Sequence, residues 1–181
     1  MAKCKGTNLV YLRSVFEKRG PEATAAFTSR LSPDELKSFQ TAFPITMVQV
    51  EEIANIFQHA AAVLYPGDPR GLRRIGYGLA QDNLKGVYRS LLRFATIPFV
   101  AGQAAKLWSV YQDRGRARAD KDLDRRRVVF TVTDFPELPK AFLEEVAGYL
   151  EGVAALTGAK DIRVVPDGSD PEAWRWTVTW S

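Results

Sequence analysis

The segment AFLEEVAGYLEGVAAL (141–156), followed by IRVV (162–165) and WRWTVTW (174–180), decides the fold of this chain. Apolar residues recur in the first segment at alternating four- and three-residue steps, which places them on one face of an amphipathic helix. The last segment alternates apolar and polar residues, as a strand with one buried face does. Because helix and strand each present one apolar side, the sequence predicts that this helix packs on a sheet.

The residues before this segment predict a series of helices followed by a hairpin. The expected helices cover residues 7–19, 21–30, 33–41, 48–64, 72–94 and 97–111. Ser32 and Glu35 have the spacing of a capping box at the start of the third helix. Strands are expected at 115–119 and 127–133, around a turn. Since short turns make neighbouring strands antiparallel, the predicted fold class is α+β, with N-terminal helices packed on one face of a four-stranded antiparallel sheet and a helix between strands 2 and 3.

A chain of 181 residues is long enough for one domain with a substantial core. We expect a single domain over 1–181, in which 1–45 is a helical N-terminal extension and 46–181 is the core of helices and four-stranded sheet. Gly76, Gly78 and Gly86 weaken the predicted helix over 72–94, and small residues there would let another backbone approach closely.

The composition, with 46% hydrophobic and 25% charged residues, is that of an ordinary soluble globule. No apolar stretch approaches the roughly 20 residues that cross a bilayer, and the opening residues lack the features of a signal peptide, so we expect a cytoplasmic protein with no membrane span. The net charge of +4 is concentrated in 113–127, where seven basic residues are offset by four aspartates. Scattered carboxylates repel a phosphate backbone, so this segment is expected to be a solvated hairpin and no nucleic-acid partner is predicted.

The sequence offers little for catalysis or metal binding, since it has one cysteine and one histidine. Cys4 lies near the terminus and is expected to be an exposed thiol without a role. His59 has no partners for a metal site or a nucleophilic pair, and is expected to be a surface or helix-packing residue. Glu144, Glu145 and Glu151 are expected on an exposed helix face. The sequence therefore predicts no metal, no cofactor, no catalytic residue and no enzymatic activity.

Five arginines leave two interpretations open. They are Arg70, Arg73, Arg74, Arg89 and Arg93. Arginine suits bidentate recognition of carboxylate or phosphate, so the set could form an anion site on the helices. Ordinary solvated side chains explain the same residues more simply.

Nine aromatic residues are candidates for lining a ligand pocket. They are Phe57, Phe94, Phe99, Trp108, Tyr111, Phe142, Tyr149, Trp174 and Trp176. Tyrosine hydroxyls and indole N–H groups could orient a ligand among them. Core packing alone also accounts for aromatic residues at helical spacing.

Three segments, FLEEVAGYLEGV (142–153), GAKDIRV (158–164) and WRWTVTW (174–180), resemble the C-terminal signature of 4-vinyl-reductase-type domains. Those domains belong with haem–nitric-oxide-binding domains and transport-particle subunits in one ligand-binding superfamily. Over its whole length, including GVYR (86–89) and LWSVYQDRG (107–115), the chain is similar to a paralogous myxobacterial family of unknown function with that fold. The resemblance implies a cavity between helices and sheet, or a groove on the helical face, that holds an apolar molecule or a partner protein.

The chain departs from these relatives at their cofactor sites. Sensors of aromatic compounds carry a cysteine-rich zinc site near the last two strands, whereas residues 165–173 contain no cysteine. Haem-binding members need a proximal histidine and a Tyr-x-Ser-x-Arg motif, and the sequence Tyr88-Arg89-Ser90 lacks that spacing. The resemblance therefore carries over the fold and a ligand site without carrying over zinc or haem.

These observations favour a non-enzymatic regulatory or sensory module that binds a small apolar ligand or a partner protein. Such a module should contain an enclosed apolar cavity above about 300 Å³. The alternative is a dimeric protein-interaction or scaffold subunit with no small-molecule ligand, whose helical face forms a symmetric homodimer. An enzyme would need an acid–base constellation in a cleft, which the residue spacing does not support.

Overall fold

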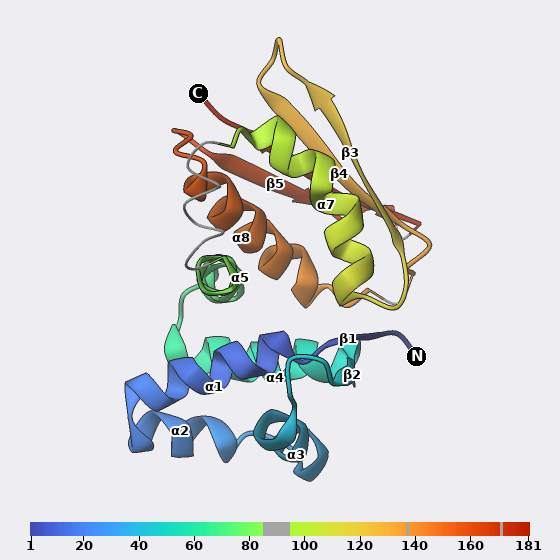
Figure 1. The fold of residues 1–181 in the computed structure, drawn as a ribbon. Helices are drawn as coiled ribbons and strands as arrows, with labels where there is room; N and C mark the ends of the chain where they lie inside the picture. The colour runs from blue at the N-terminus through green and yellow to red at the C-terminus, as the bar shows by residue number, and fades with distance from the viewer. Residues whose placement is uncertain (85–94, 137, 171) are drawn as a thin grey trace.

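The computed structural model describes residues 1–84, 95–136, 138–170 and 172–181 (Figure 1). The helices are α1 (Thr7–Arg19), α2 (Pro21–Thr28), α3 (Pro33–Thr41), α4 (Val50–Leu64), α5 (Gly71–Asn83), α7 (Ile97–Tyr111) and α8 (Ala141–Leu156). The strands are β1 (Lys3–Lys5), β2 (Met47–Gln49), β3 (Arg116–Asp122), β4 (Arg127–Thr133), β5 (Arg163–Asp167) and β6 (Ala173–Thr179).

The core of the C-terminal half is a four-stranded sheet in the order β3-β4-β6-β5, with every neighbouring pair antiparallel. The register places Phe130 opposite Trp176 and Val128 opposite Val178. The large apolar side chains of the two central strands therefore lie on the same face of the sheet. All four side chains are buried. Helix α8 connects β4 to β5, which are the second and third strands of this sheet in chain order. This connection confirms the predicted α+β fold class and the predicted position of the helix.

Helices α7 and α8 cover one face of this sheet, α7 along β3 and β4, and α8 along β5 and β6 (Figure 1). The indole N–H of Trp176 donates a hydrogen bond to the carbonyl of Leu143 at 2.9 Å, which joins the centre of the sheet to the first turn of α8. Both α7 and α8 begin and end at the residues predicted from the sequence. None of the helices in the described ranges is long and apolar enough to cross a membrane.

The N-terminal helices form a separate layer, with α5 lying between this layer and α8 (Figure 1). Phe16 and Phe27 stack with their ring centroids 4.2 Å apart. Phe39 packs against Phe27 in a T-shaped arrangement, with ring centroids 5.0 Å apart. The capping box of α3 is present as predicted, because the Glu35 amide donates to Ser32 Oγ and the Ser32 amide donates to Glu35 Oε2.

Strand β1 joins the two layers, and the sequence did not reveal it. One edge of β1 pairs with β2, which places Cys4 opposite Val48, and the other edge bridges to Gln112 just after α7. The Asp113 amide donates to the Lys3 carbonyl at 3.1 Å. Cys4 is only 1% exposed as a result, so the expectation of an exposed thiol is wrong. A strand of three residues is too short for periodicity to mark it, and both of its partners are distant in sequence.

Helices α5 and α8 cross at glycines. A Cβ atom on Gly76 would lie 1.9 Å from the carbonyl oxygen of Glu145, and one on Gly148 would lie 1.9 Å from that of Arg73. These distances confirm that Gly76 allows a close approach of another backbone, whereas Gly86 lies outside the described residues. Each helix therefore supplies a glycine where the other helix's backbone passes.

We predict that Gly148→Ala destabilises the protein by about 3 kcal/mol or more, because backbone rather than a mobile side chain occupies the space of the new methyl group. Gly102→Ala is the matched control, since its Cβ would meet only the end of the Lys121 side chain at 2.9 Å. This control should be neutral or gain up to about 1 kcal/mol of helix propensity. Urea denaturation of both variants measures the difference, and equal stabilities would contradict the importance of the crossing.

Candidate functional site

A cavity of about 160 Å³ lies between α7, α8 and the inner face of the sheet, and β1 borders it. Its lining is predominantly apolar and includes Ile97, Ala119, Val128, Phe130 and Val146. The volume falls short of the 300 Å³ expected from the sequence. It is close to that of an apolar cavity of about 150 Å³ that takes up benzene. The space therefore suits a ligand of the size of a single ring.

A larger hollow of about 340 Å³ lies at the turn between α4 and α5, beside Tyr65, Asp68 and Pro69. It contains none of the nine candidate aromatic residues, and exposed residues of the turn form part of its wall. We place the candidate site in the smaller cavity, because burial of a ligand by apolar walls is what supplies binding free energy.

Four of the nine candidate aromatic residues line the cavity. They are Trp108, Tyr111, Phe142 and Tyr149. Phe57 is fully buried behind them, with its ring centroid 6.1 Å from that of Phe142.

The other candidate aromatic residues do not line it. Trp174 and Trp176 are buried in the sheet, but neither borders the cavity. Phe99 is 63% exposed on α7, and Phe94 lies outside the described residues. Helical spacing identified residues that turn toward the core, but it could not separate those beside the cavity from those packed elsewhere.

Polar groups from β1, α1, α5, α8 and the end of α7 gather in the cavity wall. Cys4 comes from β1, Gln112 follows α7, and Glu145 and Tyr149 come from α8. Asn8, in the first turn of α1, places its amide nitrogen 3.6 Å from the sulfur of Cys4. The cavity therefore has polar groups in an otherwise apolar lining, which is the usual construction of a small-molecule site.

Glu145 is the functional candidate that sequence reasoning missed. It is 4% exposed, so its expected position on an exposed helix face is wrong. A signal was present, because Glu145 lies three residues after Phe142 and four before Tyr149 and so shares the buried stripe of α8. Helix α5 shields this part of α8 from solvent, since Gly76 of α5 lies against the backbone of Glu145.

Burial raises the pKa of the Glu145 carboxyl to about 8. Within the described ranges we find no hydrogen bond or ion pair that offsets this loss of solvation. Burial is also the main cause of the raised pKa of Cys4, with the charges of Glu145 and Asp113 adding to it, and it raises the pKa of Tyr149 to about 12. At neutral pH these three side chains are therefore mainly in their protonated, neutral forms.

The arginines of α5 are engaged by carboxylates, which argues against an anion site there. Arg73 lies 2.9 Å from Glu151 and 3.3 Å from Glu144, and Arg74 lies 2.6 Å from Asp68. Arg70 is 3.8 Å from Glu151. Arg89 and Arg93, the other two arginines of the proposed set, lie outside the described residues.

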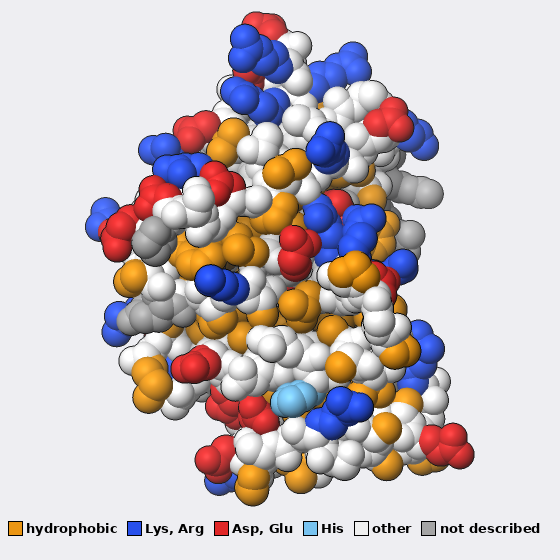
Figure 2. All heavy atoms as spheres, turned by 180° about the vertical axis from the view of Figure 1, so that it is seen from behind, with side chains coloured by type: hydrophobic (Ala, Val, Ile, Leu, Met, Phe, Trp, Pro, Cys, Tyr) orange, Lys and Arg blue, Asp and Glu red, His pale blue; other side chains and the backbone are white. Residues whose placement is uncertain are grey.

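The single histidine, His59, lies on α4 and reaches the surface of the molecule (Figure 2). It does not border the cavity. In the part of the chain that the structure describes, no group of three or more His, Cys, Asp or Glu side chains could hold a metal ion.

The charged segment 113–127 forms the β3–β4 hairpin, which projects from one end of the molecule (Figure 1). Arg116 lies 2.8 Å from Asp134, and Arg118 lies 3.1 Å from Asp120, all with exposed side chains. The hairpin is thus solvated, and several of its charges pair with one another or with Asp134 nearby, in agreement with the sequence-based interpretation.

No family model and no curated protein matches the chain. Several solved structures match its fold over almost the whole length. An H-NOX protein from S. oneidensis in the Fe(II)NO ligation state aligns with a TM-score of 0.70 at 11% identity, covering 98% of this chain and 99% of that one. The Fe(II) unliganded H-NOX protein from K. algicida aligns with a TM-score of 0.68 at 11% identity, covering 98% and 96%. An oxygen-binding H-NOX domain related to soluble guanylate cyclases gives 0.64 at 11% identity, covering 97% and 92%.

These comparisons establish that the chain has the H-NOX fold. At such low identity the likeness extends to the path of the backbone and not to the chemistry of a site.

We predict that Glu145→Gln flattens the pH dependence of stability between about pH 5 and pH 8. The folded state holds the Glu145 proton up to a pKa of about 8, whereas an unfolded glutamate has a pKa of 4.5. The stability contributed by the protonated form is therefore complete below pH 4.5 and is lost as pH rises through 8, at no more than about 1.4 kcal/mol per pH unit.

Denaturation of wild type, Glu145→Gln and the control Glu144→Gln at several pH values measures this effect. Glu144 is more exposed and paired with Arg73, so its variant should retain the wild-type slope. A Glu145→Gln profile parallel to that of the wild type would refute the assignment.

Proposed function

We propose that this chain is a non-enzymatic, cytoplasmic regulatory or sensory module that binds a small apolar molecule in the cavity between α7, α8 and the sheet. The observation that carries the proposal is the cavity itself, about 160 Å³ in volume, with Trp108, Tyr111, Phe142 and Tyr149 in its wall. Burying a ring-sized molecule against such a lining is favourable by about 25 cal/mol per Å² of apolar surface.

Haem is the group that the fold suggests, because solved H-NOX structures are described by their iron ligation and haem distortion. The described residues of this chain do not fit it. His59 does not line the cavity, and the volume suits one ring rather than a tetrapyrrole. We therefore propose an organic ligand held without haem.

The proposed module consists of one domain over residues 1–181, and we place it in the paralogous myxobacterial family that its sequence resembles. Support for one domain comes from the buried core, which extends from Leu12 in α1 through Ile53 in α4 to Trp176 in β6. The segment 1–45 is tied to the rest by β1, which contacts both β2 and the end of α7.

We predict that Ala119→Phe weakens binding of toluene, used as a ring-sized probe, by about tenfold or more. Ala119 lines the cavity from β3 and pairs with Phe130, so a phenyl group there occupies the space of the ligand. Arg118→Phe is the matched control, since neighbouring residues of a strand point to opposite faces. Titration followed by NMR measures both affinities, and unchanged binding by Ala119→Phe would exclude this cavity as the site.

The second candidate is a homodimeric interaction subunit, and the outer face of α7 favours it. Phe99 and Val110 are exposed by 63% and 45%, and their spacing places them on one side of the helix, away from the cavity. A second copy of the chain could cover this face through an isologous contact.

If this second function holds, the protein sediments as a dimer at micromolar concentration and Val110→Lys, which does not touch the cavity, converts it to a monomer. Arg118→Ala, on the exposed face of β3, is a control that should leave the sedimentation coefficient unchanged. A wild-type monomer across the concentration series would reject the dimer.

A further inference from the structure

We propose that the ligand of the cavity is a compact organic acid, whose carboxylate pairs with the ammonium of Lys5 while its apolar body fills the space between α7, α8 and the sheet. This inference rests on the proposed ligand site and specifies the polar end of its ligand. Two observations lead to it: the division of the cavity wall into a polar and an apolar end, and the charges that the wall carries.

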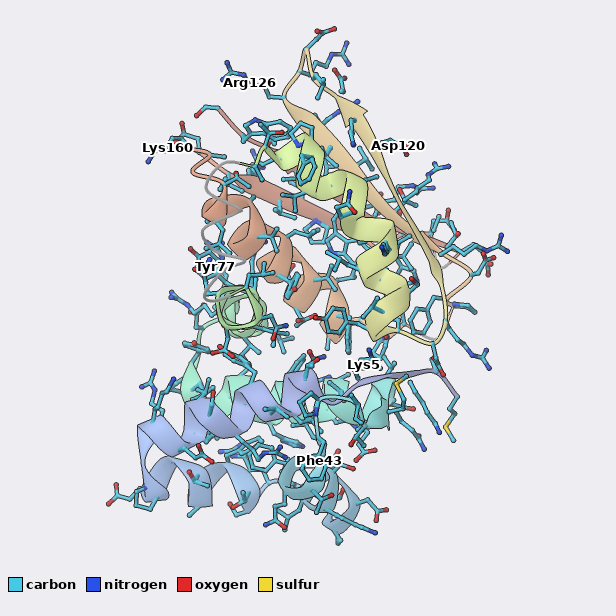
Figure 3. The ribbon with its side chains drawn as sticks, in the orientation of Figure 1. Lys5, Phe43, Tyr77, Asp120, Arg126 and Lys160 are labelled. Carbon is cyan, nitrogen blue, oxygen red and sulfur yellow. The ribbon has the colours of Figure 1, made fainter. Side chains whose placement is uncertain are left out.

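Most polar groups of the wall lie at one end of the cavity. Lys5 follows Cys4 on β1, and Cys4 bridges to Gln112 at the end of α7. Glu145 of α8 is close enough to Cys4 for its charge to raise the pKa of that thiol. Figure 3 shows Lys5 on β1 beside the end of α7. Polar side chains of β1, α7 and α8 therefore converge there.

The opposite end of the cavity is predominantly apolar. Helices α7 and α8 run in opposite directions, so the start of α7 lies toward the end of α8 (Figure 1). The wall residues from these segments include Ile97, Val100, Val153 and Ala154. Thr157, also in the wall, donates its hydroxyl to the carbonyl of Ala154 at 2.7 Å. The cavity thus suits an amphipathic molecule whose apolar part contacts these side chains and whose polar part lies beside β1.

The ionisable groups of the described wall favour an anion over a cation. Lys5 contributes an ammonium group. Cys4, Glu145 and Tyr149 are mainly neutral at neutral pH, because burial raises their pKa values. A bound carboxylate therefore meets an attractive positive charge in the described wall, whereas a bound ammonium would be repelled by Lys5.

The ammonium of Lys5 has no carboxylate partner in the part of the chain that the structure describes. It lies 5.9 Å from the centroid of the Tyr111 ring, which leaves its N–H donors available to a ligand. Asp113, next to the end of α7, is exposed and accepts a hydrogen bond from the Lys3 amide at 2.7 Å.

The exposure of Lys5 also suits a charged ligand group. Lys5 is half-buried, so the wall beside it reaches the surface of the molecule. A carboxylate bound there stays close to water, which avoids the large cost of burying a charge among apolar side chains. The apolar body of the same ligand can still enter the cavity.

Three ligands of similar size test the inference: benzoate, its neutral analogue benzamide, and toluene, each titrated calorimetrically at neutral pH. We expect wild type to bind benzoate about fivefold or more tightly than benzamide, as a charge-assisted hydrogen bond implies. The advantage of benzoate should shrink at high salt, because salt screens a partly exposed ion pair. Toluene binding should not weaken with salt.

Lys5→Met removes the ammonium and keeps an apolar side chain of similar length. Lys3→Met is the matched control, since Lys3 lies on the same strand, is exposed and is outside the wall, and its loss changes the net charge equally. Lys5→Met should lose about fivefold or more in benzoate affinity while its toluene affinity is retained. Lys3→Met should bind all three ligands as wild type does.

The comparison of benzoate with benzamide needs no variant, so it decides the inference even if Lys5→Met does not fold. Benzoate bound no more tightly than benzamide, a benzoate affinity independent of salt, or equal losses in the two lysine variants overturns the acid inference. Toluene binding in any of these cases leaves the apolar site standing. Failure of all three ligands to bind overturns the proposed ligand site as well.

Discussion

The close crossing of α5 and α8 is the constraint on which the rest of the structure depends. Gly76 and Gly148 each lie where the other helix's backbone passes, so neither position accommodates a side chain. This contact places Arg73 beside Glu144 and Glu151, and it encloses the part of α8 that carries Glu145. With α8 also joined to the sheet through Trp176, the orientation of the cavity wall is fixed from both sides.

The polar side of the cavity has an energetic consequence. Burying the Glu145 carboxyl without a protein donor disfavours its charged form, which is why its pKa lies near 8. A buried carboxyl without a protein donor lowers the stability of the protein. Strained groups and strongly perturbed pKa values of this kind cluster at functional sites in folded proteins. The buried carboxyl and the apolar cavity lie together, because Glu145 forms part of the cavity wall.

The same backbone fold accommodates different chemistry in different proteins. Solved H-NOX structures align over nearly the whole chain, yet the lone histidine of this protein is on α4 at the surface, away from the cavity. Side chains at the lining positions, rather than the arrangement of helices and strands, decide what such a cavity binds. Here the described lining consists of aromatic rings, aliphatic side chains and a few polar groups, among them Glu145 and the lysine Lys5.

The sequence by itself determined the elements whose patterns are local and strong. Helices α7 and α8, the strands β4 and β6 and the capping box at Ser32 follow from periodicity, strict alternation and a fixed spacing of side-chain types. Only the tertiary structure decided the burial of Cys4 and Glu145, the pairing of β1 and which aromatic residues border the cavity. Those features arise where segments distant in sequence meet, and a pattern within one segment carries no information about the element that packs against it.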